Sequence, residues 1–285
     1  MTFPAPLPPR RTLLRGAYAV VVAAVLVAWL LPLAAVALTS MRPAEDLARG
    51  NYFGWPSDFA ALGNYREVLA GSGIVRAMAN SLAITLPAVI GTVVVASMAG
   101  FALAKHRFPG NRALLLAFVA GNLVPAQVLM IPVRDLMIAL HLYDTRVALV
   151  LFHVAFQTGF ATLFMRNFIR ELPDAVLDAA RVEGASELAV FFRVVVPLTR
   201  PAMAAIAVLV FTFVWNDYFW SLVLVRSDAI RPLTATLANL RGMYQASWHL
   251  VCAGAIVAAL PPCAMFFVLQ RHLVAGLTGV RHAEG

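Results

Sequence analysis

One charged segment between two apolar runs holds the residues best suited to binding another protein. It covers residues 171–201, and its charged side chains include Asp178, Arg181 and Glu183. Small residues lie among them, and side chains this small let another surface approach the backbone closely; these are Ala179, Ala180, Gly184 and Ala185. The chemistry they predict is non-covalent docking of a soluble partner.

Local signals predict two short helices in residues 171–201, which we call the two-helix segment. Pro173 suits the first turn of a helix, because its missing N–H needs no partner there, and Gly184 offers a stop. Ser186 can cap a second helix. Pro197 is expected to end it, because the residue before a proline is pushed out of the α region. An ordinary amphipathic loop helix is the alternative.

A second polar group lies within the apolar run 202–225. Asp217 would be costly inside a bilayer unless it faces water or a partner. Trp215 and Tyr218 offer flat faces suited to a sugar ring, and Asn216 can donate and accept. We interpret this group as the wall of a translocation path, with an interfacial aromatic belt or an interhelical polar pair as the alternative. Further path candidates, for which interhelical hydrogen bonds are the alternative, are Asn122, Gln127, His153 and Gln157.

The composition predicts a membrane protein. Hydrophobic residues make up 61% of the 285 residues and charged residues 13%, whereas soluble domains carry about 25% charge. The net charge of +8 could suggest nucleic acid, but the arginines cluster at the ends of apolar runs, which is typical of membrane topology.

No catalytic or metal-binding constellation stands out in the sequence. Cys252 and Cys263 are too far apart along one apolar stretch to form a disulfide, and no Cys/His cluster has metal-ligand spacing. The phosphate-loop motif G-x-x-x-x-G-K-[ST] is absent, so this chain is not expected to hydrolyse ATP.

Apolar runs of about twenty residues must be helical in lipid, so the sequence predicts an all-α polytopic fold with six spans. The spans are expected near 17–38, 77–104, 113–133, 147–166, 202–225 and 249–270, within a transmembrane domain of residues 17–272. The first run is longer than a signal-peptide core and is interpreted as a retained span. Gly91, Gly100 and Gly121 are expected to permit close helix packing, and Pro125 to kink its helix.

The basic residues predict an orientation. The short turn 105–112 is basic, so the positive-inside rule places it in the cytoplasm. With six spans, the tails 1–16 and 273–285 and the loop 167–201 then lie on the same side.

The run Asp178-Ala179-Ala180, followed by Gly184 and Pro197, resembles the EAA loop of ABC-importer permeases, with Asp178 in place of Glu. Leu62-Gly63-Asn64-Tyr65, Asn80-Ser81 and Trp215-Asn216 are similar to the maltose-permease-like carbohydrate type. The C-terminal tail departs from that pattern, because Gly276-Leu277-Thr278 is followed by Gly279-Val280-Arg281.

The resemblance implies a permease subunit, not an enzyme, that moves a sugar or related solute across the inner membrane. It also implies three protein partners: a second homologous permease, an ABC ATPase dimer that holds ATP and Mg and docks on the loop, and a periplasmic or extracellular solute-binding protein. A nucleic-acid partner is not expected. The alternatives are a permease for glycerol phosphate, a polyol or another non-sugar solute, a secondary transporter or channel, and an intramembrane enzyme.

Overall fold

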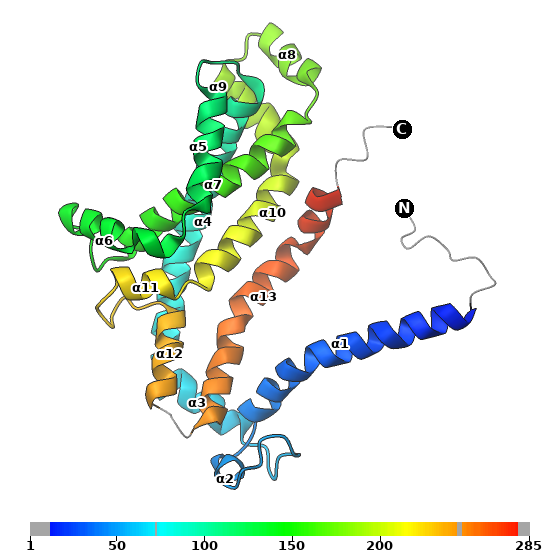
Figure 1. Ribbon diagram of the computed structural model, residues 1–285, viewed down its shortest axis with the longest axis vertical. Helices are drawn as coiled ribbons and strands as arrows, with labels where there is room; N and C mark the ends of the chain where they lie inside the picture. The colour runs from blue at the N-terminus through cyan, green and yellow to red at the C-terminus, as the bar shows by residue number, and fades with distance from the viewer. Residues whose placement is uncertain (1–11, 72, 244–246, 279–285) are drawn as a thin grey trace. The chain divides into compact units, whose positions relative to one another are not determined.

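The computed structural model describes residues 12–71, 73–243 and 247–278, and the regular structure within these ranges is entirely helical (Figure 1). The chain divides into two compact units. The first comprises Met1–Ser72 with Leu240–Val257, and the second Gly73–Asn239 with Ala258–Gly285.

The first unit is built around the polar stretch that follows the first apolar run. Helix α1 (Thr12–Ser40) is followed by α2 (Ala44–Ala48) and α3 (Ala61–Gly71). Arg42, only 1% exposed, donates to the carbonyls of Asn51 and Gly54. Asn64 Nδ2 in turn donates to the Arg42 carbonyl at 2.9 Å. The buried guanidinium therefore organises the loop between α1 and α3.

The centre of the second unit is a close pair of helices. Helix α4 (Ile74–Lys105) packs along α7 (Arg146–Arg170), and α10 (Val196–Trp215) lies against both. A Cβ on Gly91 would lie 2.9 Å from Val154 Cγ2, and one on Gly100 would lie 2.9 Å from the Arg166 backbone nitrogen. These two glycines permit close packing, as predicted. Gly121 does not, because no atom of the residues that the structure describes lies within 4 Å of the position that its Cβ would take.

The third apolar run, expected to span the membrane near 113–133, is broken at Pro125, where a kink was expected. Helix α5 (Asn111–Leu123) is followed by a 3₁₀ turn, η2 (Ala126–Leu129), and by α6 (Met130–Ala139). The two parts are bent by 94°. Pro125 lacks an N–H and holds Val124 in an extended conformation, which ends the first helix. Within the part of the chain that the structure describes, five helices are long and apolar enough to cross a membrane, or six with this bent pair, so the all-α membrane class is confirmed.

The helix boundaries around the fifth apolar run, 202–225, also differ from those expected. Helix α9 (Glu187–Val190), the π-helical turn η3 (Phe191–Val195) and α10 form one continuous candidate span, so Pro197 does not end a helix. Pro197 occupies the second position of α10, where the preceding π turn interrupts the regular ladder and its missing N–H is tolerated. The helix ends instead at Trp215, and 202–225 is therefore not one helix.

After α10 the chain turns into α11 (Phe219–Leu224), α12 (Leu233–Met243) and α13 (Trp248–Thr278). The loop 226–232 is bound to the start of α4. Asn80 Nδ2 donates to two carbonyls of this loop at 3.0 Å each, and Ser81 Oγ accepts from the Leu233 N–H at 2.8 Å. These contacts give the Asn80-Ser81 pair a structural role.

Candidate functional site

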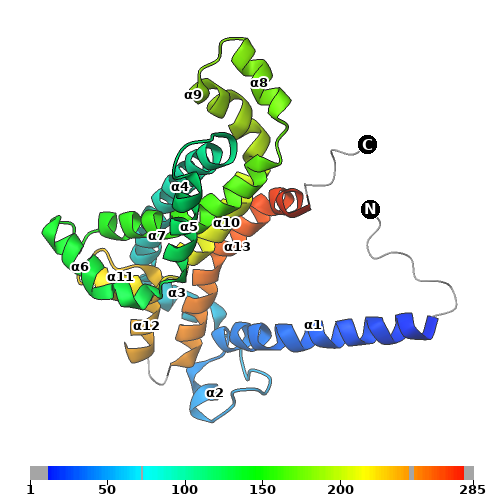
Figure 2. The same cartoon turned by 45° about the horizontal axis from the view of Figure 1, so that its top comes forward.

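The two-helix segment has the internal structure that its sequence predicts up to Ser186. Helix α8 (Asp174–Val182) ends before Gly184, which has φ +85°, and Ser186 Oγ accepts from the Ala189 N–H at the start of α9. Figures 1 and 2 show α8 projecting beyond the ends of α4 and α5. The segment therefore forms a projection at one end of the second unit.

A charged network connects the two helices of this projection. Arg181 Nε donates to Glu187 Oε1 at 2.8 Å, and Arg181 Nη1 donates to Asp178 Oδ1 at 2.9 Å. Hydrogen bonds to Glu187 and then to Asp178 raise the pKa of the Arg181 guanidinium above its ordinary value. Arg181 thus joins α8 to α9 across Gly184.

The end of α4 is bound to both helices of the projection. Lys105 Nζ donates to Asp174 Oδ1 and to the Leu172 carbonyl, at 2.7 Å each. His106 Nε2 lies 3.1 Å from Glu187 Oε2. Sequence reasoning missed both contacts, because the partners are far apart along the chain. The available signal was the predicted placement of the basic turn and the acidic segment on one side of the membrane.

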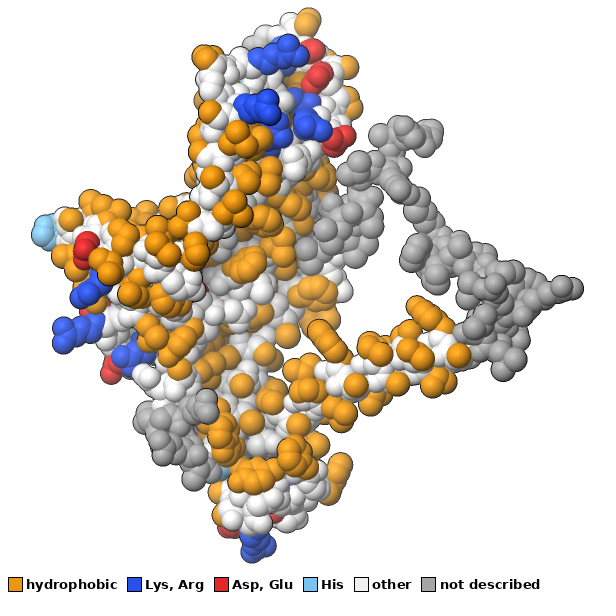
Figure 3. All heavy atoms as spheres, in the orientation of Figure 1, with side chains coloured by type: hydrophobic (Ala, Val, Ile, Leu, Met, Phe, Trp, Pro, Cys, Tyr) orange, Lys and Arg blue, Asp and Glu red, His pale blue; other side chains and the backbone are white. Residues whose placement is uncertain are grey.

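The outer surface of the projection carries exposed apolar side chains. Leu177 is fully buried, whereas Val182 is 89% exposed and Val176 and Leu188 are also exposed. Glu183 and Gly184 are exposed between them. Figure 3 shows charged side chains gathered at this end of the second unit, beside hydrophobic surface. Exposed apolar side chains beside charges are compatible with the docking predicted for this segment.

The other predicted docking residues lie at different depths. Ala179 and Pro197 are exposed, and Ala180 and Ala185 are half-buried. Asp178 and Arg181 bond to each other and are only partly available to a partner. The side chains that the predicted docking residues leave open at this surface are therefore mainly small and apolar.

Asp217 lies in the turn between α10 and α11 and connects helices. Its carboxylate accepts from the N–H groups of Trp220 and Ser221 at 3.2 Å each, which caps α11. Its Oδ2 atom also lies 3.6 Å from Nε2 of buried His153 on α7. The structure thus has the interhelical polar pair that was the alternative to a path wall.

The remaining residues of this turn differ in exposure. Trp215 is 3% exposed, stacks on Phe211 and donates from Nε1 to the Ala258 carbonyl at 3.1 Å, which packs α10 against α13. Asn216 and Tyr218 are exposed. Elsewhere in the second unit, Gln127 is exposed on η2 and Gln157 is half-buried on α7.

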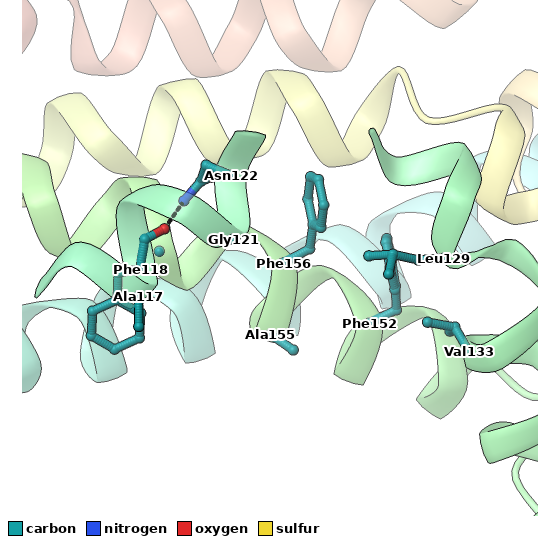
Figure 4. Close-up of a pocket in the computed structure, with 10 residues that line it drawn as sticks. Ala117, Phe118, Gly121, Asn122, Leu129, Val133, Phe152, Ala155 and Phe156 are labelled. Atoms are coloured by element: carbon teal, nitrogen blue, oxygen red, sulfur yellow. Dashed lines mark hydrogen bonds between the residues drawn. The ribbon is translucent and has the colours of Figure 1, made fainter. Parts of the chain in front are cut away.

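Asn122 lines a cavity of about 280 Å³ between α5, α6 and α7. Its Nδ2 donates to the Phe118 carbonyl at 2.7 Å (Figure 4). Gly159 leaves the room that this amide occupies, because a Cβ there would collide with Asn122 Nδ2. The rest of the lining is mostly apolar and includes Leu129, Val133, Phe152 and Phe156. One amide among aromatic faces could accept the ring of a small solute.

Residues 92–279 match the family described as "Binding-protein-dependent transport system inner membrane component". The match covers the C-terminal part of α4 and everything from α5 to α13, including the two-helix segment. The chain belongs to this family. It is therefore an integral component of a membrane transport system, and we call it the permease.

Curated relatives cover nearly the same length as the permease. The osmoprotective compounds uptake permease protein GgtD of Synechocystis sp. is 36% identical, over 87% of this chain and 86% of the relative. The arabinooligosaccharides transport system permease protein AraQ of Halalkalibacterium halodurans and the trehalose transport system permease protein SugB of Mycobacterium tuberculosis are each 32% identical, over 87% of this chain. These matches cover 88% of AraQ and 90% of SugB.

The fold of the permease is also found in a solved structure. A bacterial ABC transporter involved in the import of the acidic polysaccharide alginate contains a chain that matches with a TM-score of 0.81 and 24% identity. The match covers 94% of the permease and 99% of that chain. At this identity the likeness shows the fold.

Proposed function

We propose that the permease carries a sugar or a related osmolyte inward as part of an ABC importer, and that the two-helix segment receives the force from a separate ATPase. The relatives named for arabinooligosaccharides, trehalose and osmoprotective compounds support this class of solute. The observation that carries the proposal is the anchoring of α8 and α9 to the end of α4 by Lys105 and His106.

The partners follow from this function. An ATPase dimer would hold ATP and Mg and dock on the apolar surface around Val182. A second permease subunit would complete the path, and a solute-binding protein would deliver the solute from outside. A solved bacterial alginate ABC transporter in complex with a pentasaccharide-bound periplasmic protein contains a chain of similar fold, with a TM-score of 0.65 and 13% identity. Both termini would lie in the cytoplasm.

A series of contacts in the second unit supports this proposal, because it would carry movement from α8 to the spans. A push on α8 would pass through Asp174 and Lys105 to α4, and through Arg181 and Glu187 to α9. From α9 the continuous helix runs through η3 and α10 to Trp215, next to Asp217 and its contact with His153. Rigid elements that move as bodies are the usual means of alternating access. The solute would pass Asn122, Gln127, Gln157, Asn216 and Tyr218, with Trp215 and Asp217 fixing the helix beside them.

Two substitutions at Gly184 test the docking role. Both Gly184→Ala and Gly184→Leu place a side chain at φ +85° and carry the same backbone strain, about 1 kcal/mol. Among the described residues nothing lies within 4 Å of the new Cβ, so this chain leaves open space there and a docked partner would oppose the extra bulk of leucine. We expect the Leu variant of the assembled importer to lose solute uptake while it inserts normally, and the Ala variant to keep most of it. Equal uptake by the two variants would contradict docking at this surface.

A further inference from the structure

We propose that the turn between α4 and α5 binds the phosphate headgroup of an anionic phospholipid through Arg107 and Arg112, which we call the arginine pair. This role is separate from the proposed force transmission, although the turn directly follows Lys105, which bonds to Asp174.

The basic side chains of this turn fall into two groups. Lys105 and His106 point into the protein and bond to Asp174 and Glu187. Arg107 and Arg112 are exposed, and among the described residues neither makes an ion pair. These two guanidinium groups, at the ends of adjacent helices, are therefore open to an anionic partner from outside the chain.

The turn holds the arginine pair around a preformed hollow. Asn111 Nδ2 donates to the carbonyls of Leu103 and His106, at 3.2 and 3.0 Å, and closes the turn. An open hollow of about 590 Å³ is lined by both arginines together with His106, Phe108 and Asn111. Guanidinium groups bind phosphate oxygens through paired N–H donors, so the chemistry of this hollow suits a phosphate ester.

The surface next to the arginine pair distinguishes a lipid from a free phosphate. No residue of α5 is buried within this chain, and Leu114 and Leu116, close behind Arg112, are 44% and 58% exposed. Phe108, between the two arginines, is 38% exposed. A ligand that covers this surface needs an anionic head and apolar tails. Membrane proteins bind anionic lipids through basic clusters at helix ends.

The test measures lipid retained by the full-length permease purified together with its partners. Native mass spectrometry would follow the binding of phosphatidylglycerol and phosphatidylcholine to the unchanged protein, to the R107Q/R112Q variant and to an R66Q/R76Q control. The control removes two exposed charges from the opposite side of the predicted topology. We expect phosphatidylglycerol to bind the R107Q/R112Q variant about thirtyfold more weakly and the control unchanged, since each arginine near a membrane surface contributes about a factor of five.

Three results would overturn the proposal. If the R107Q/R112Q variant bound phosphatidylglycerol as tightly as the unchanged protein, the arginine pair would not be part of a lipid site. Displacement of the lipid by millimolar inorganic phosphate would assign the pair to a soluble anion. Loss of a co-purifying permease chain from the variant, with lipid binding unchanged, would assign the pair to a protein interface. A melting temperature matching that of the unchanged protein would show that the variant folds.

Discussion

Lys105 Nζ lies 2.7 Å from Asp174 Oδ1, so the last residue of α4 is bonded to the first residue of α8. The lysine side chain is 7% exposed, which holds the ammonium group in place, whereas the carboxylate is open to water. The hydrogen bond from Lys105, and then its charge, lower the pKa of Asp174, so this carboxylate is ionised at neutral pH. The contact therefore links α8 directly to α4, which is a candidate membrane span.

Breaking this contact should separate ATP hydrolysis from transport. In Asp174→Asn the amide no longer offers Lys105 a charged partner, and α8 can shift without moving α4. We expect the ratio of solute uptake to ATP hydrolysis in proteoliposomes to fall severalfold. Glu171→Gln is the control, because it removes a neighbouring exposed acid that makes no ion pair among the described residues. An unchanged ratio in Asp174→Asn would show that the bond carries no force.

Adding one methyl group at Gly100 should destabilise the fold. The new Cβ would lie 2.9 Å from a backbone nitrogen of α7, and backbone cannot rotate away, so α4 and α7 must separate. Overpacking of this kind costs about 1–3 kcal/mol. Thermal unfolding in detergent should show a lower midpoint for Gly100→Ala, while Gly121→Ala, which meets nothing within 4 Å, should match or exceed the unchanged protein. A normal midpoint for Gly100→Ala would disprove the close packing.

The loop after α11 should lose stability in acid. Burial raises the pKa of Asp144, but hydrogen bonds from the Ser227 hydroxyl and from the backbone N–H groups of Ser227 and Arg226 outweigh it and lower the pKa below its ordinary value. A carboxylate whose pKa is lower in the folded than in the unfolded protein stabilises the fold at pH values above its unfolded pKa, about 3.9. That stabilisation is lost as the pH falls through the folded pKa.

Asp144→Asn tests this dependence. At pH 7 the variant should be less stable by about 1 kcal/mol, because hydrogen bonds to a charged group contribute about 1.5–3 kcal/mol and water screens part of this at the partly exposed Asp144. Because the asparagine does not ionise, the difference in thermal midpoint between the two proteins should shrink as the pH falls below about 4. A difference that stays constant down to pH 3 would show that the carboxylate charge is not responsible.

The sequence predicts those parts of this fold that depend on neighbouring residues. Gly184 and Ser186 end one helix and begin the next through their own backbone and side-chain chemistry, and the structure shows both. Pro197 misled the same local reasoning. The effect of a proline depends on the helix before it, and a π turn there is not visible in residue types.

The contacts that assemble the candidate site depend on distant residues. In the sequence, nothing distinguishes Lys105 and Asp174 from other charged residues near the membrane surface. They become partners because α4 packs on α7. The residue type of Trp215 alone is compatible with a path wall, an aromatic belt or an interhelical contact. Its burial against α13 follows from how the helices of the second unit pack, which periodicity does not reveal.

Photo-crosslinking from Val182 tests the central claim most directly. This side chain is 89% exposed at the end of α8, so a benzoylphenylalanine there would react with whatever docks on the projection. In intact cells we expect a product that contains this permease and an ATP-binding-cassette subunit. The same probe at Arg226, on the loop after α11, should give no such product. A crosslink to the ATPase from Arg226 and none from Val182 would contradict the account.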